Sequence, residues 1–292
     1  MNPEILVILL VAIPLFCGFL FSIFSKKAVI AKILSVISAC LILVISILLF
    51  KTELRISVGG WKPPLGISIS YDGFTAIMIV IVAFISLSSI IYSLGYMKRY
   101  TSQAKYYALF FLMLAGMNGV LITGDIFNMY VFIEIASIAS YVLVGFGVEN
   151  EELEASFKYI VQGSIGSAFI FVGIAVMYAT FGTLNMADIA LKMKALNVKG
   201  ASVYLSLAFF LMGFSLKAAL FPFHAWLPDA HPSAPAPISA MLSGLLVKAI
   251  GIYSIMRITF SAYGFNESIQ NIFLILGSLS MIIGVLLALG QW

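Results

Sequence analysis

The chain has 292 residues, of which 62% are hydrophobic and 10% are charged, and it carries a formal net charge of +4. Soluble domains contain about 45–50% apolar and 25% charged residues, so this composition excludes a water-soluble domain. The basic residues are scattered over short loops and form no patch, which indicates no nucleic-acid partner.

Nine apolar runs are long enough to cross a bilayer core, because a membrane-spanning helix needs about 20 such residues. They lie at roughly 4–24, 29–50, 74–96, 106–124, 126–147, 156–181, 203–222, 236–260 and 269–290. The sequence therefore predicts an all-α, multi-pass transmembrane helical bundle. Without a tandem repeat or a soluble linker, residues 1–292 are expected to form a single transmembrane domain. The first run lacks the basic n-region of a signal peptide, so we expect it to be retained.

The first two runs contain Cys17 and Cys40, the two cysteines of the chain. Two cysteines are too few for an iron–sulfur cluster, and neither has the spacing of a Cys or His metal site. We therefore expect no catalytic residue, metal, cofactor or redox centre in this chain.

Two connections are longer than the rest. Residues 51–73 contain Trp61 and an alternation of Ile and Ser over 67–70, which predicts an interfacial hairpin anchored by the tryptophan. Residues 182–202 carry several charges and are expected to form a loop. The positive-inside rule gives no orientation, because the Lys and Arg residues of the two sides balance. One side has Lys26, Lys27, Lys32, Lys98, Arg99, Lys105 and Lys158; the other has Lys51, Arg55, Lys62, Lys192, Lys194, Lys199 and Arg257.

Glu134 is the outlier among the twelve acidic residues, because the others lie in loops or within about a turn of a helix end. Asp125, just before the fifth run, fits an N-cap and equally a position at a channel mouth. The small residues of 163–168 predict a close approach of two helices.

Two lysines, Lys217 and Lys248, are embedded in apolar sequence. A charge at mid-membrane costs about 2.5–3.5 kcal/mol on insertion scales, so we expect both lysines and Glu134 to face one another or a hydrated interior. A carboxylate favours a protonated lysine, whereas desolvation favours the neutral amine, so these residues predict a proton relay. The alternative is a static ion pair of Glu134 and Lys217 that fixes the helix register.

Residues 221–237 contain five of the nine prolines and both histidines, so no continuous helix passes through them. The seventh span is therefore expected to be broken about one turn after Lys217, like the discontinuous helices of transporters. His224 is a candidate to pass protons between water and the lysines. Asp229 and His231 are candidate loop or channel-mouth residues. A metal site from these three side chains is the alternative, and no further ligand lies nearby in the sequence.

A resemblance rests on two of these stretches, LKAALFPFHAWLPDAHP over 216–232 and AMLSGLLVK over 240–248. They resemble the antiporter-like membrane subunits shared by respiratory complex I, Mrp-type sodium/proton antiporters and energy-converting membrane-bound hydrogenases. Residues 119–134 and 182–188 are most similar to the D-type subunit of the Mrp antiporter and its hydrogenase relative. The resemblance extends over essentially the whole chain.

The resemblance implies a fold of about fourteen helices in two inverted repeats, of which this chain holds the first part, with the N-terminus and the predicted hairpin on the outer face. It assigns the relay to Glu134 on the fifth helix, Lys217 on the seventh and Lys248 on the eighth, with His224 near the break. Family members take the far end of the relay from their second half, whereas this sequence stops at Trp292. We therefore expect a partner subunit or a longer natural chain to complete the pathway.

The resemblance predicts a proton-translocating, antiporter-like subunit of a multisubunit complex in the cell membrane, with Na⁺ as a second candidate ion. Its expected partners are other membrane subunits of an Mrp, hydrogenase or complex I-like assembly, in which any nickel–iron and iron–sulfur centres belong to the partners. Two alternatives stay open. One is a structural anchor of a redox complex without transport, and the other is a quinone-binding oxidoreductase subunit.

Overall fold

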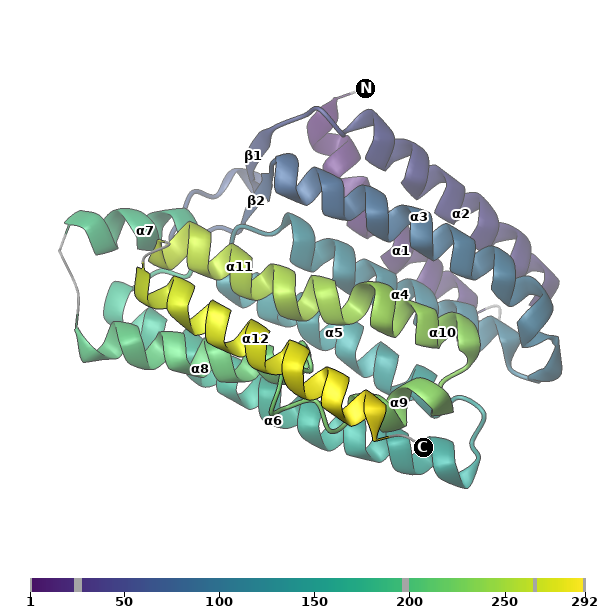
Figure 1. Ribbon diagram of the computed structural model, residues 1–292. Helices are drawn as coiled ribbons and strands as arrows, with labels where there is room; N and C mark the ends of the chain where they lie inside the picture. The colour runs from purple at the N-terminus through teal and green to yellow at the C-terminus, as the bar shows by residue number, and fades with distance from the viewer. Residues whose placement is uncertain (1, 24–27, 196–199, 265–266, 291–292) are drawn as a thin grey trace.

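The computed structural model describes residues 2–23, 28–195, 200–264 and 267–290. Within them, eight helices are long and apolar enough to cross a membrane. Seven are α1 (Pro3–Ile23), α2 (Ala28–Leu48), α3 (Gly73–Tyr96, continued by η2, Met97–Arg99), α4 (Gln103–Ile122), α5 (Ile126–Val144), α6 (Asn150–Phe181) and α12 (Glu267–Leu289), and the eighth covers residues 236–263. A shorter apolar helix, α8 (Ala201–Lys217), ends at the proline-rich segment. The predicted multi-pass helical bundle with a broken seventh span is confirmed (Figure 1).

The helix over residues 236–263 changes its winding along its length. Its α-helical parts are α10 (Ala236–Met241) and α11 (Ser254–Ile258), and its π-helical parts are η3 (Leu242–Tyr253) and η4 (Thr259–Tyr263). A π-helix forms i→i+5 hydrogen bonds, and its short stretches are frequently found at functional sites. Lys248 lies in the middle of η3.

The connection between α2 and α3 folds as the predicted hairpin. Strands β1 (Leu54–Ser57) and β2 (Ser68–Tyr71) pair antiparallel, η1 (Val58–Gly60) begins the turn, and Trp61 beside it is 65% exposed. The expected loop over 182–202 contains a helix instead, α7 (Met186–Ala195), whose charges are spaced for an i,i+4 ion pair between Lys192 and Asp188. Lys199 lies outside the described residues.

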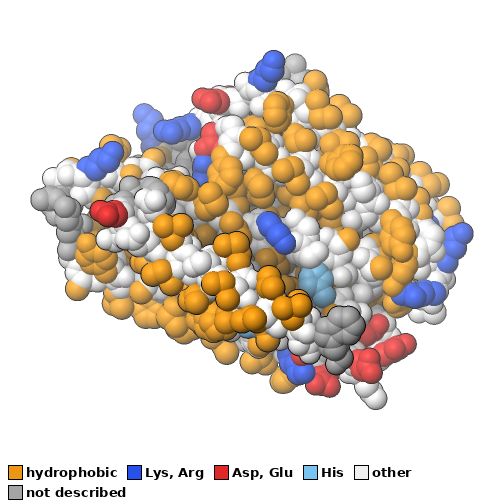
Figure 2. All heavy atoms as spheres, viewed as in Figure 1, with side chains coloured by type: hydrophobic (Ala, Val, Ile, Leu, Met, Phe, Trp, Pro, Cys, Tyr) orange, Lys and Arg blue, Asp and Glu red, His pale blue; other side chains and the backbone are white. Residues whose placement is uncertain are grey.

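The hairpin and α7 lie at one end of the bundle, which we call the hairpin end (Figure 1). Isolated backbone bridges, Ile69 to Thr123 and Asp125 to Asn185, join the connections that meet there. The short helix α9 (Leu227–Ser233) lies at the opposite end, which we call the α9 end. Charged side chains gather near the ends, and hydrophobic ones cover most of the face between them (Figure 2), as expected for a membrane span.

The helices pack around α4, which lies between α1 and α5, while α6 packs between α5 and α8. Over an 18-residue stretch of each helix, 83% of the residues of α4 are buried and none of those of α12, whose one buried residue, Ile269, lies near the helix start outside that stretch. The contact of α6 with α8 is close, since a Cβ atom on Gly213 would lie 2.7 Å from the Gly166 carbonyl oxygen. This confirms the helix approach predicted from the small residues of 163–168, and it presses the broken helix against α6.

Candidate functional site

One face of α5 carries Glu134, Ser137 and Tyr141, which follow at spacings of three and four residues and therefore share that face. Lys217, the last residue of α8, meets it. The Lys217 Nζ atom donates hydrogen bonds to Ser137 Oγ at 3.0 Å and to the Tyr141 hydroxyl at 3.2 Å, and it lies 3.9 Å from Glu134 Oε1. The structure thus brings Glu134 and Lys217 together in a long ion pair, while two neutral hydroxyls accept the hydrogen bonds of the lysine.

The two partners of this pair differ in exposure. The Lys217 side chain is 4% exposed and that of Glu134 is 30% exposed. Ser167 of α6 donates a hydrogen bond to Glu134 Oε1, the same oxygen that lies nearest to Lys217. Gly163 of α6 leaves room for the Tyr141 hydroxyl, which a Cβ atom there would meet at 2.0 Å. The arrangement fixes the lysine and its hydroxyl partners, while the carboxylate keeps an open side.

The break after α8 places Lys217 at a helix C-terminus. Ala219 adopts a positive φ of 50°, and no α-helix resumes before α9. The indole Nε1 of Trp226 donates to the Leu216 carbonyl oxygen at 3.0 Å and so satisfies an orphan acceptor of the helix end. The Trp226 ring stacks on Tyr159 of α6 with centroids 4.2 Å apart. The partial negative charge of a helix C-terminus favours a cation there.

His224 lies within the break, near the ring of Phe221. Its Nδ1 atom is buried and has no hydrogen-bond partner among the described residues. Its predicted part in proton transfer stays a prediction.

Asp229 and His231 of α9 make separate contacts. Asp229 Oδ2 lies 2.8 Å from Lys158 Nζ of α6, and His231 Nδ1 lies 2.8 Å from Ser239 Oγ. In the part of the chain that the structure describes, no three His, Cys, Asp or Glu side chains are grouped to hold a metal ion.

Lys248 is exposed on the surface of the bundle, and its Nζ atom donates to the Ser243 carbonyl oxygen. No described acidic side chain forms an ion pair with it. Burial, and then the charge of Lys248, lower the pKa of His231, which indicates that these two residues are close. The structure brings Lys248 near the break and not into contact with Glu134 or Lys217.

Asp125 lies at the hairpin end and is the N-cap of α5, where its Oδ1 atom accepts the Asn128 backbone N–H at 2.9 Å. Burial raises the pKa of Asp125, against the lowering effect of the backbone hydrogen bonds from Asn128 and Phe127. A place at a channel mouth stays a prediction.

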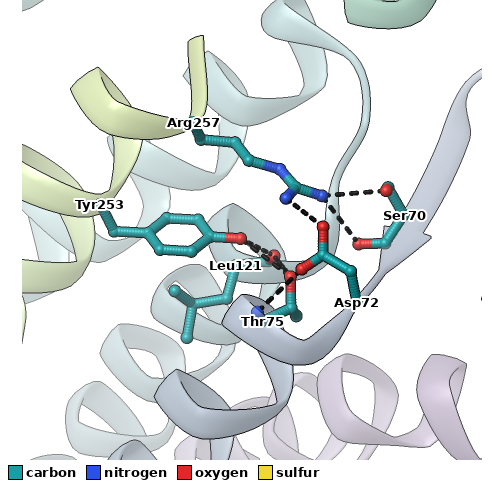
Figure 3. A network of polar contacts seen from close by, with 6 residues as sticks. All are labelled: Ser70, Asp72, Thr75, Leu121, Tyr253 and Arg257. Atoms are coloured by element: carbon teal, nitrogen blue, oxygen red, sulfur yellow. Dashed lines mark hydrogen bonds and ion pairs between the residues drawn. The ribbon is translucent and has the colours of Figure 1, made fainter. Parts of the chain in front are cut away.

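A second polar cluster involves Arg257, which was expected among the loop cations. The Arg257 side chain is 8% exposed, and its guanidinium pairs with Asp72 Oδ2 at 2.5 Å and with Ser70 Oγ at 2.9 Å (Figure 3). Beside it, the Tyr253 hydroxyl donates to the Leu121 carbonyl oxygen at 2.6 Å and contacts the Thr75 hydroxyl. This cluster ties the helix over 236–263 to α3, α4 and β2. The position of Arg257 inside the predicted span 236–260 was the sequence feature that could have indicated a charge within the bundle.

Asp72 also caps α3, because its Oδ1 atom accepts the Thr75 backbone N–H at 3.0 Å. Burial acts to raise the pKa of Asp72, but the hydrogen bonds from Thr75 and Arg257 and the guanidinium charge outweigh it. The pKa of Asp72 therefore lies below its ordinary value.

Two sequence profiles of known families match the chain. The profile described as NADH:quinone oxidoreductase/Mrp antiporter, TM, matches residues 123–292. The profile described as NADH-Ubiquinone oxidoreductase (complex I), chain 5 N-terminus, matches residues 56–107.

Curated relatives and solved structures extend this similarity. The chain is 36% identical over 262 residues to the N-type subunit of NADH-quinone oxidoreductase from Desulforudis audaxviator, covering 87% of this chain and 52% of the relative. It is 35% identical over 295 residues to the D-type subunit of the Na(+)/H(+) antiporter from Alkalihalophilus pseudofirmus, covering 98% and 59%. A chain of the membrane-bound sulfane sulfur reductase, an archaeal respiratory membrane complex, superposes with a TM-score of 0.84 at 36% identity, covering 94% and 57%. The chain thus spans a little over half the length of these proteins.

Proposed function

Because this chain belongs to the membrane-subunit family of NADH:quinone oxidoreductases and Mrp antiporters, we propose that it moves protons as an antiporter-like subunit of a multisubunit membrane complex. One observation carries the proposal: the buried ammonium group of Lys217, at the end of a broken helix, faces a carboxylate that is close but not locked to it. A pair that served only to fix helix register would gain most from direct, short contact.

The geometry supports a proton step at the Lys217 Nζ atom. While the Glu134 carboxylate is near, it stabilises the protonated amine. When the carboxylate turns toward its open side, the buried ammonium loses its counter-charge, and its proton becomes transferable. The hydroxyls of Ser137 and Tyr141 keep the amine in place through the step, because each can be either donor or acceptor.

His224 and Lys248 are the proposed proton-transfer groups that follow Lys217. His224 lies in the break that adjoins Lys217, with a free Nδ1 atom, and imidazole exchanges protons near neutral pH. Lys248 lies on the bundle surface, so its proton acceptor would come from outside the described residues. A neighbouring subunit or a continuation of the chain would supply that acceptor.

The test uses inverted membrane vesicles that contain the native complex, with a pH-sensitive dye to report ion-coupled proton movement. We expect Glu134→Gln and Lys217→Ala each to abolish this movement while the complex still assembles on native gels. Lys105→Gln, at an exposed lysine near the start of α4, is the matched control and should behave like the wild type. Normal transport per assembled complex in the first two variants, with assembly reduced, would instead identify a structural anchor.

A further inference from the structure

A groove runs along the surface between α2 and the C-terminal end of α3. It has a volume of about 600 Å³ and lies apart from both polar clusters. Because the hairpin joins the other ends of these two helices, the groove opens at the α9 end of the bundle (Figure 1). It therefore lies in the membrane leaflet opposite the hairpin.

The walls of the groove are apolar. Val29, Ile33 and Ile37 follow at spacings of four residues on α2, and these side chains are 68%, 56% and 57% exposed. Eight residues of helix rise by about 12 Å, so the stripe extends from the helix end toward the bilayer centre. On α3, a Cβ atom added to Gly95 would meet nothing within 4 Å, which leaves this wall open. The shape suits an extended hydrocarbon chain.

Two lysines lie at the mouth of the groove. Lys32 belongs to the second turn of α2 and Lys98 to η2, so both lie near the helix ends, where we expect lipid headgroups, and both line the cavity. No carboxylate of the described residues forms an ion pair with either lysine. The adjacent Arg99 is engaged elsewhere, because its guanidinium stacks on the Tyr96 ring at 3.9 Å from the centroid. The groove therefore offers two unpaired ammonium groups above an apolar floor.

We propose that this groove binds an anionic glycerophospholipid, with the phosphate between Lys32 and Lys98 and one acyl chain along α2. Basic pockets between membrane helices bind anionic headgroups, and each nearby lysine strengthens binding to an anionic lipid. A zwitterionic lipid brings its own cation and would match the two lysines less well. The site is independent of the proposed proton transport, since none of its residues touches Glu134 or Lys217.

The experiment is native mass spectrometry of the purified full chain in mild detergent, titrated with phosphatidylglycerol or with phosphatidylcholine of the same acyl chains. We expect K32Q and K98Q each to weaken phosphatidylglycerol binding about fivefold, and the double variant about 30-fold. Gly95→Leu should also weaken it with both charges intact. The control K51Q/K62Q removes the same charge at exposed lysines of the hairpin end, and it should bind as the wild type does.

Other outcomes overturn the proposal. Equal binding of the two lipids, or unchanged binding in K32Q/K98Q, would show that the lysines do not recognise a headgroup. If inorganic phosphate displaced the lipid and Gly95→Leu had no effect, the lysines would form a simple anion site without an acyl groove. If Gly95→Cys cross-linked to a partner polypeptide in the native complex, a protein helix would occupy the groove instead.

Discussion

Two acid–base contacts in this molecule look alike in composition but are built differently. Each sets a nearly buried cation, Lys217 or Arg257, against a carboxylate that is 30% or 41% exposed. Arg257 binds Asp72 directly at 2.5 Å. Lys217 lies 3.9 Å from Glu134 and donates its hydrogen bonds to the hydroxyls of Ser137 and Tyr141 instead. Guanidinium stays protonated in proteins, but a lysine amine can release its proton. Distance and donor chemistry together separate the proposed proton-transfer site from a contact that holds helices together.

The largest expected effect comes from replacing the lysine of the proposed proton-transfer site, Lys217, by arginine. Lys217→Arg keeps the positive charge but removes a proton that can be transferred at neutral pH, so we expect proton movement to fall by about 100-fold or more. Dye-based transport in vesicles measures this, with native-gel assembly as the control. Transport near the wild-type rate would mean that Lys217 acts only as a fixed charge, and the contrast between the two contacts would disappear.

The next effect concerns stability at the hairpin end. Asp72→Ala removes the N-cap of α3 and leaves Arg257 without its counter-charge, and the partial exposure of the carboxylate moderates the loss. We expect a loss of about 2 kcal/mol, read from thermal unfolding of the purified protein in detergent. Asp72→Asn keeps a capping oxygen and should lose less. Equal losses in the two variants would assign the effect to the ion pair alone.

A smaller effect is expected from Arg257→Lys, the reverse of the first exchange. Lysine keeps the charge, but its single ammonium nitrogen cannot replace the two guanidinium nitrogens that contact Asp72 and Ser70. The free energy of unfolding should therefore fall by about 1 kcal/mol. Proton movement per assembled complex should stay at the wild-type rate. A strong loss of transport in a fully assembled complex would show that Arg257 belongs to the proton pathway.

The smallest effect is a pH dependence. The pKa of Asp72 is lowered in the folded protein, so its contribution to stability is complete above the unfolded value of about 4. That contribution is lost as the pH falls through the lower folded value. The difference in unfolding temperature between the wild type and Asp72→Asn should therefore be constant from about pH 7 to 5 and shrink below about pH 4. A difference that persisted at about pH 2 would mean that the contact does not depend on the carboxylate charge.

Hydropathy predicted the membrane spans, the density of prolines over 221–237 predicted the broken helix, and the specific stretches 216–232 and 240–248 indicated the family. The hairpin also followed from the alternation of Ile and Ser over 67–70, with Trp61 beside it. Glu134 and Lys217 could be selected as a pair because each charge stands alone in an apolar run. The hydroxyls of Ser137 and Tyr141 that accept hydrogen bonds from Lys217 could not be selected, since Ser and Tyr are common in membrane helices.

Other features depend on which way a helix is turned, and composition does not encode that. Lys248 was expected to face Glu134 and Lys217 or a hydrated interior, whereas among the described residues it lies in η3 on the bundle surface. Arg257 was counted with the loop residues. Its partner Asp72 lies 185 residues earlier in the chain, so the sequence around Arg257 does not indicate the ion pair. The helix α7 is short and carries charges at both ends, so its sequence looks like that of a solvated connection.

The central position of α4 has a consequence for biogenesis. Of the eight candidate spans, α4 is the least hydrophobic by sequence and the most fully buried, whereas α12 is among the most hydrophobic and has Ile269 as its one buried residue. A translocon admits each segment largely by its own hydrophobicity, before the final neighbours have arrived. α12 can therefore partition into lipid alone, while α4 depends on α1, α3 and α5 to hold it in the bilayer. Substitutions that weaken those neighbours should appear first as failed membrane integration of α4.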